Sequence, residues 1–230
     1  MKDIFSDLKS LKPTPPTKEV EKNCGSIYNP RLSVIKYSTA GQKDIDIELK
    51  LLPFCGSSED AIYKPQHNLC RTVKLNGKDI TKNSFTTCNS VRDEPCPICD
   101  HTGVNLPIIH NFLVNVLILK DTQHPELEGK IMLYQCDVDI SEFIYNAKDE
   151  NPFDGKNGKI LKINIASSPA RPYHTNTMSW IEPIKIDDLD TILDACSDYE
   201  TAVYKYVHTL DKIRETFHFY CMDKNIQENV

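Results

Sequence analysis

Hydrophobic and polar positions alternate clearly in one stretch near the start of the chain. Apolar residues stand at positions 45, 47, 49 and 51, with Asp46, Glu48 and Lys50 between them, and Pro53 follows. Successive side chains of a strand point to opposite faces, so this stretch predicts a half-buried strand. Residues 112–120 are almost continuously apolar, which is typical of a strand buried on both faces and predicts the centre of a sheet.

Turn and cap signals predict the other elements. Asn76-Gly77 interrupts residues 61–87 and predicts a β-hairpin there. Further strands are predicted at 130–134 and 159–166, after glycine-containing turns. Residues 140–147 have helical spacing after Asp139, the expected N-cap, and residues 187–221 predict two helices. Strands followed by helices predict a mainly β fold with α-helices, a small barrel or sheet with a helical C-terminus.

The charge of the chain is unevenly distributed. Its 230 residues have a net charge of −6, and residues 186–230 carry four basic against ten acidic side chains. Residues 64–92 carry six basic side chains against Asp79 alone: Lys64, Arg71, Lys74, Lys78, Lys82 and Arg92. This distribution is compatible with a local site for a polyanion, and the alternative is a solvated basic face.

The hydropathy of the chain and its N-terminal residues indicate the kind of compartment in which the protein is expected. No apolar run approaches the about 18 residues that a membrane span needs, and the N-terminus lacks the pattern of a secretory signal. We therefore expect a protein of a reducing interior that does not enter a membrane. Residues 1–34, with Pro13-Thr14-Pro15-Pro16, predict a flexible arm.

Three of the nine cysteines stand close together, as Cys88 and Cys96-Pro97-Ile98-Cys99. A tight Cys-x-x-Cys turn with a third cysteine from an adjoining strand end is typical of a structural zinc site. The rival interpretation, a redox Cys-x-x-Cys, would need a helix directly after it, whereas residues 100–103 predict a loop. The remaining six cysteines are interpreted as small buried apolar side chains.

The fourth ligand has several candidates. His67 and Cys70 both precede the predicted hairpin, whereas His101 and His110 lie past the last cysteine. We favour His67 over Cys70. Four protein ligands leave no open coordination position, so the single zinc ion is expected to be structural. No zinc-hydrolase or deaminase motif accompanies the cysteines, and no enzymatic activity is predicted.

The chain resembles the single-stranded DNA-binding (helix-destabilising) protein family of T-even-type bacteriophages over residues 35–210. The pieces that carry the resemblance occur in the family's order: 40–42, 51–53, 76–78, the cysteine turn 96–99, 115–121, 125–130 and Tyr134. Between Cys99 and Asn115 the chain is shorter than the family pattern. It also lacks the family's basic N-terminal element and long acidic, serine-rich tail.

The resemblance implies an oligonucleotide-binding (OB) barrel at 35–186 with a zinc subdomain at about 62–111, followed by an acidic helical region at 187–230. It implies one His and three Cys ligands, which correspond to His67, Cys88, Cys96 and Cys99. Its stacking aromatic residues correspond to Phe85, Phe112, Tyr134 and Tyr173. Base stacking suits binding without sequence preference, and Lys64, Arg71, Lys74, Lys78, Lys82 and Arg171 would contact phosphates.

The predicted function is therefore sequence-independent coating of single-stranded DNA in phage DNA replication, recombination and repair. The expected setting is the cytoplasm of the infected bacterial host. Expected partners are single-stranded DNA, phage replication and recombination proteins, and further copies of the chain along the DNA. The alternative is a zinc-stabilised protein-interaction module without strong DNA binding. Acidic residues 187–200 form either a plain surface helix or a segment that docks partner proteins or occupies the DNA cleft.

Overall fold

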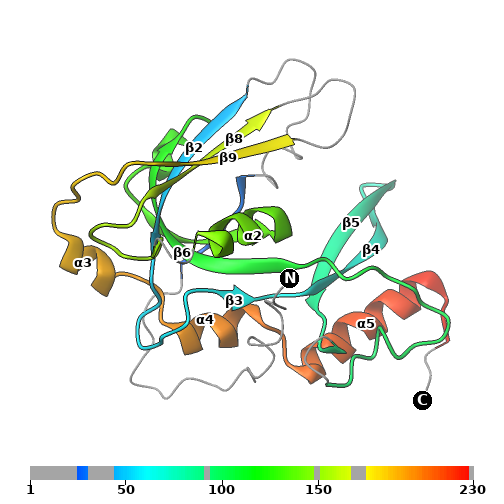
Figure 1. Cartoon of the computed structure of the whole chain (residues 1–230). Coiled ribbons are helices and arrows are strands. Elements are labelled where there is room, and N and C mark those ends of the chain that lie inside the picture. Colours follow the sequence, from blue (N-terminus) through cyan, green and yellow to red (C-terminus); the bar gives the residue numbers. More distant parts are fainter. Residues whose placement is uncertain (1–24, 31–43, 91–93, 148–150, 167–174, 228–230) are drawn as a thin grey trace. The chain divides into compact units, whose positions relative to one another are not determined.

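The computed structural model describes residues 25–30, 44–90, 94–147, 151–166 and 175–227 (Figure 1). The chain divides into two compact units. Unit 1 contains the described residues between 63 and 111 and between 202 and 227, and unit 2 contains those between 25 and 62 and between 112 and 201. Each unit therefore joins segments that are far apart in the sequence. Most of the predicted N-terminal arm lies outside the described residues.

Most of the strands form one mixed sheet of seven in the order β1-β7-β6-β2-β8-β9, with β3 pairing with β6 off this path. The fold is thus mainly β with helices. The strands of this sheet are β1 (Ile27–Tyr28), β2 (Ile45–Leu52), β3 (Ile62–Tyr63), β6 (Asn111–Asp121), β7 (Ile131–Asp137), β8 (Ile160–Ala166) and β9 (Thr175–Ile181). β1 runs parallel to β7, whereas β2 is antiparallel to both β6 and β8.

The structure confirms the two strands that were predicted from the alternating and the continuous apolar stretches, as β2 and β6. On β2, Ile45, Ile47 and Leu49 are buried, and β6 is buried along most of its length. Leu49 pairs with Ile118 on β6 and with Leu161 on β8, so its side chain lies in the middle of the sheet. Burial on one face therefore fixes the register of these strands.

Two buried polar side chains of unit 2, Asn115 and Lys50, form hydrogen bonds with backbone groups of the same unit. Asn115 donates hydrogen bonds to the carbonyls of Pro53 (3.2 Å) and Ser197 (3.1 Å) and accepts one from the Ser197 amide. Lys50 donates to the carbonyls of Asp154 (2.7 Å) and Gly158. Burial lowers the pKa of Lys50, and the nearby Asp154 opposes this shift. Both residues hold loops against the sheet.

The helices differ from the prediction in detail. Helix α2 (Val138–Asn146) is capped by Asp137, whose carboxylate accepts from the Ile140 amide at 3.1 Å, so the expected cap at Asp139 was wrong. Three helices follow instead of two: α3 (Leu189–Asp194), α4 (Tyr199–Tyr206) and α5 (Leu210–Lys224). Strand β9 was not predicted, because its sequence is largely polar. Among the described residues, none of the helices is long and apolar enough to cross a membrane.

Unit 1 contains the predicted hairpin, made of β4 (Gln66–Leu75) and β5 (Lys78–Thr87). Asn76 and Gly77 both have positive φ, 50° and 76°, as the tight hairpin turn requires, so this prediction is confirmed. Pairing is continuous from Gln66 opposite Thr87 to Leu75 opposite Lys78.

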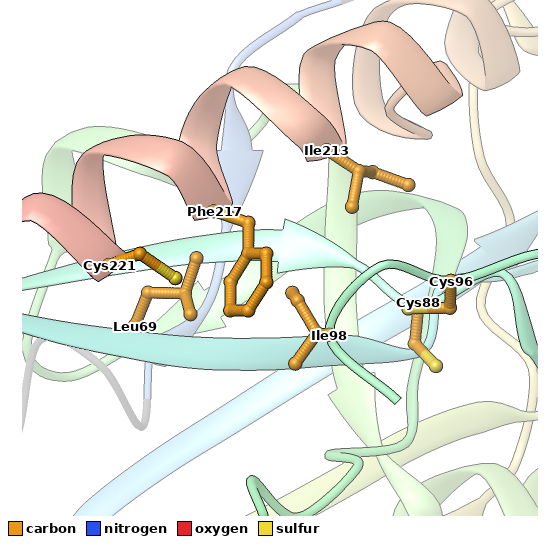
Figure 2. Packing of buried hydrophobic residues seen from close by; sticks show 7 residues of the cluster. All are labelled: Leu69, Cys88, Cys96, Ile98, Ile213, Phe217 and Cys221. Carbon is orange, nitrogen blue, oxygen red and sulfur yellow. The ribbon is translucent and has the colours of Figure 1, made fainter. Parts of the chain in front are cut away.

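Helix α5 covers one face of this hairpin. It begins after Thr209, whose hydroxyl accepts from the Lys212 amide, and ends at Asn225 in the left-handed conformation. Figure 2 shows Phe217 reaching from α5 towards Leu69 and Ile98, with two cysteines at one end of the same cluster. The cluster comprises Leu69, Cys88, Cys96, Ile98, Ile213, Phe217 and Cys221. Two of the candidate metal ligands, Cys88 and Cys96, are therefore part of the hydrophobic core of unit 1.

Candidate metal centre

Four candidate ligands meet at the base of the hairpin in unit 1. His67 is the second residue of β4, and its register partner Thr86 stands two residues before Cys88. The Cys88 amide donates to the Pro65 carbonyl at 2.8 Å, which keeps Cys88 beside the start of β4. Cys96 and Cys99 come from the turn that follows. Strand pairing thus brings together residues 67 and 88, and the turn supplies the other two.

The ligand atoms are close enough to share one ion. The Nε2 atom of His67 lies 3.3 Å from the Cys99 sulfur and 3.8 Å from the Cys96 sulfur, and the sulfurs of Cys88 and Cys99 are 3.6 Å apart. All four ligand atoms lie within 4.8 Å of one another. Cys88, Cys96 and His67 are buried, and Cys99 is exposed. This cluster could hold a metal ion.

Second contacts orient the ligands. The Nδ1 atom of His67 lies 3.3 Å from the Pro107 carbonyl oxygen, which directs Nε2 towards the sulfurs. The Cys96 amide donates to the Asp100 carboxylate at 3.1 Å, and the Asp100 amide donates to the Cys96 carbonyl at 2.9 Å, closing the turn between the two cysteines. The ring and the turn are therefore held in position by the protein itself.

The other candidates for the fourth ligand are engaged elsewhere. Cys70 is three residues from His67 on β4 and therefore points to the opposite face, where its thiol donates to Asn83 Oδ1 at 3.0 Å. His101 accepts from the Gly103 amide at Nδ1 and donates through Nε2 to the Gln227 carbonyl. His110 bonds the Tyr63 hydroxyl through Nδ1 at 2.6 Å.

The thiols strongly affect one another's ionisation. A hydrogen bond from the Cys88 thiol, together with contacts to His67 and backbone amides, lowers the pKa of Cys96 to about 3. The same bond and burial raise the pKa of Cys88, and burial raises the pKa of Cys99. The Cys96 thiolate is thus stabilised mainly by the Cys88 thiol. A cation among the sulfurs would let all three ionise together.

The Cys96–Cys99 turn lacks the context of a redox Cys-x-x-Cys. Residues 100–108 have no helix, and Cys96 is fully buried. The surroundings of the turn therefore fit metal ligation better than redox chemistry. Of the six cysteines outside the cluster, Cys136, Cys196 and Cys221 are buried as expected. Cys55 and Cys70 are half-buried, and Cys24 lies outside the described residues.

The predicted DNA-contacting residues have different surroundings. Lys74, Lys78 and Lys82 are exposed on the hairpin, Arg71 is half-buried there, and Phe85 is 37% exposed. Lys64 is buried. Arg171 and Tyr173 lie outside the described residues, as does Arg92.

Two of the predicted stacking residues belong to the hydrophobic core. Phe112 is 4% exposed and Tyr134 is 2% exposed. Tyr134 contacts the Tyr28 ring, with the ring centroids 6.0 Å apart. A ring without an exposed face cannot stack on a base, so these two positions are better explained by packing.

The charge of the described residues is sorted between the units. Unit 1 carries nine Lys/Arg against six Asp/Glu, and unit 2 carries seven against nineteen. Residues 187–230 were predicted to form one acidic region, but six acidic residues and no basic ones lie at 187–200. Residues 202–227 belong with the hairpin and contribute four basic side chains, of which Lys205 stands between Tyr204 and Tyr206.

The fold and the cluster define a mainly β protein with a His/Cys₃ group at the base of a basic hairpin. Comparison with known protein families and with curated proteins finds no match to this chain.

Proposed function

We propose that the protein binds single-stranded DNA without sequence preference and that a structural zinc ion in the His/Cys₃ cluster supports the binding surface. The observation that carries the proposal is the hairpin itself. Its outer part presents exposed lysines, its base is formed by the candidate metal ligands, and the partly exposed Phe85 lies close to that base. Positive charge for phosphates and an aromatic face for bases are what binding of a single strand requires.

Zinc fits the ligand set and its spacing. Thiolates with one imidazole are ligands that zinc prefers, and a tetrahedral zinc site places two sulfurs about 3.8 Å apart and a sulfur and a nitrogen about 3.5 Å apart. The cluster has a sulfur–sulfur distance of 3.6 Å and nitrogen–sulfur distances of 3.3 and 3.8 Å. Four protein ligands complete the shell, so the proposed role is structural and not enzymatic.

Positive charge is concentrated on one face of the hairpin, because Lys74, on the other face, stands opposite Asp79 in the register. Residues opposite one another in the register point to the same side, so Phe85 and Lys74 share one face, and Lys78 and Lys82 share the other with Leu69. α5 packs on the second face at Leu69 and reaches Thr72, whose amide donates to the Asp223 carboxylate at 3.2 Å. Lys78 and Lys82 are exposed. A single strand beside the hairpin would meet Lys78 and Lys82 on this face, and Lys74 next to Asp79 on the other.

The resemblance to the phage family supplies the setting of the proposal. It would make the seven-stranded sheet an OB barrel and would place the protein in phage DNA replication, recombination and repair in the host cytoplasm. Partner replication and recombination proteins and self-association along DNA belong to the same proposal. The acidic residues 187–200 would dock such partners.

A fluorescence anisotropy titration with labelled oligothymidylate and its duplex counterpart, at several salt concentrations, tests the function. Zinc-loaded protein should prefer the single strand, and affinity should fall as salt rises. Replacing Lys74, Lys78 and Lys82 by Ala should flatten the slope of log affinity against log salt by about 2, since each phosphate contact contributes about 0.7. The matched control replaces the exposed Lys130, Lys156 and Lys185 of unit 2 and should leave the slope unchanged.

Phe85→Ala should weaken binding by about 1–3 kcal/mol with the slope kept, because stacking releases no counterions. Absence of binding at low salt, or equal binding of duplex, would refute the proposed function.

One observation favours the alternative, a zinc-stabilised protein-interaction module. Phe219 and Met222 are 47% and 62% exposed on α5, and they are neighbours on the helix surface. An exposed apolar pair of this kind suits a protein partner. If the protein retains zinc but does not bind the oligonucleotide, the result would favour this alternative, with Phe219 and Met222 as the residues to test.

A further inference from the structure

The ring of Tyr206, at the end of α4, lies among lysines in unit 1. The Nζ atom of Lys64 is 5.8 Å from the centre of this ring, and that of Lys205 is 5.2 Å away. Lys64 is only 6% exposed, whereas Lys205 is exposed and Tyr206 is half-buried. Both ammonium groups lie over the half-buried ring as cation–π contacts. A base that stacks on Tyr206 would therefore take the place of the exposed Lys205 ammonium group, which could then bind the neighbouring phosphate.

His208 ties this segment to the base of the hairpin. Its Nδ1 atom is 3.1 Å from the Thr86 hydroxyl, and its amide donates to the Thr87 hydroxyl at 2.9 Å. Thr87 directly precedes the ligand Cys88. The position of Tyr206, two residues before His208, is therefore fixed relative to the candidate metal centre.

Positive charge gathers at this place. Burial lowers the pKa of His208, and the charges of Lys64 and Lys212 lower it further. Burial also lowers the pKa of Lys64, to about 8, so this lysine is still mostly charged at neutral pH.

The first turns of α5 contribute acidic side chains as well, and these are engaged with basic ones of the same helix. Glu215 pairs with Lys212 at 2.7 Å, and Asp211 pairs with Arg214 at 3.7 Å. Because these acids are already paired, they offset Lys205 and Lys64 only weakly.

We propose that Tyr206 and Lys205 form a second contact site for single-stranded nucleic acid, in which the Tyr206 ring stacks on a base and Lys205 binds the neighbouring phosphate. Lys64 and His208 are positioning residues: the first keeps positive charge beside the ring, and the second fixes the segment to the hairpin. The inference rests on the proposed function and extends it, because this site lies outside the hairpin strands and in the part of the chain that the sequence suggested was acidic.

The test uses full-length, zinc-loaded protein and labelled oligothymidylate. Tyr206→Leu should lower affinity about 5- to 150-fold, and Tyr206→Phe should keep it within about twofold, since phenylalanine also offers a stacking face. Tyr145→Leu, at a 39% exposed tyrosine of unit 2, is the matched control and should have no effect. Lys205→Ala should flatten the salt slope by about 0.7, and Lys185→Ala should not.

Ultraviolet cross-linking of the oligonucleotide followed by peptide mapping gives a second readout that does not depend on any substitution. Cross-links should include the peptide that contains Tyr206 as well as hairpin peptides. If the wild-type protein binds and the hairpin variants weaken it, while Tyr206→Leu and Lys205→Ala bind normally and no cross-link maps to residues 204–208, this inference is wrong and the proposed function stands. If the wild-type protein does not bind, both fall.

Discussion

Cys96→Ser is the sharpest perturbation of unit 1, because Cys96 belongs both to the metal cluster and to the hydrophobic core. A serine hydroxyl is a poor substitute for a thiolate, so the variant should lose the ion. Structural zinc binding contributes about 10–16 kcal/mol in small zinc domains at neutral pH, which is comparable to the whole free energy of unfolding of a typical domain.

The expected loss can be bounded from below. An ion present at about 1,000 times its dissociation constant stabilises the folded state by about 4 kcal/mol, and a tighter site contributes more. Cys96 is also fully buried, so a hydroxyl without a partner there costs about 1–3 kcal/mol in addition. We therefore expect unit 1 to lose at least about 5 kcal/mol and to unfold locally.

Metal content and amide hydrogen exchange together check this expectation. The wild-type protein should contain one zinc per chain and Cys96→Ser none. Protection should disappear from β4, β5 and α5, while β2, β6 and β8 of unit 2 stay protected. The matched control is Cys70→Ser, since Cys70 lies on β4 with the candidate ligand His67 but points away from the cluster. A Cys96→Ser protein that keeps its metal and its protection, or a Cys70→Ser protein that loses them, would refute the assignment.

Three further substitutions test unit 2 and the buried lysine. Gly158→Ala should cost several kcal/mol in urea unfolding, because its Cβ would lie 2.6 Å from the Asp154 carbonyl oxygen; Gly25→Ala, with no contact under 3.9 Å, should be nearly neutral. Asn115→Ala should cost about 2–4 kcal/mol by the same measurement, since it leaves buried backbone groups without partners. The pKa of Lys64 is about 8 in the folded protein, against 10.5 for an unperturbed lysine. Between these two pH values the unfolded chain binds more protons than the folded protein. The free energy of unfolding should therefore rise with pH in this range, by about 3 kcal/mol. Lys64→Met should abolish that rise, and an unchanged pH profile would contradict it.

Local sequence patterns predicted the elements whose residues carry their own signal. The alternation at 45–51 requires one buried face, and the apolar run at 112–120 requires two, so β2 and β6 could be placed without any other information. Asn76-Gly77 is nearly sufficient for its turn, because both residues tolerate positive φ. The N-cap of α2 was misplaced by two residues, since Asp137 and Asp139 are both suitable caps.

The sequence analysis missed the features that depend on tertiary contacts and not on a local sequence pattern. Strand β9 has a largely polar sequence and, among the strands of the described residues, pairs with β8 alone, so its apolar content gives little indication of a strand. The end of α4 and helix α5 were grouped with the acidic residues before them, although they belong to unit 1. The burial of Tyr134 also depends on packing that no short stretch of sequence specifies, whereas Phe112 opens the apolar run 112–120, whose pattern already indicated burial.

The sequence by itself indicated three cysteines as candidate metal ligands, because Cys96-Pro97-Ile98-Cys99 is a local turn close to Cys88. It left the fourth ligand open between His67 and Cys70. Only the tertiary structure decided in favour of His67: the two residues are three apart on β4 and so face opposite sides, and pairing with β5 turns the His67 side towards Cys88. A turn can be read from neighbouring residues, whereas the side of a strand that faces a ligand 21 residues away is set by register and packing.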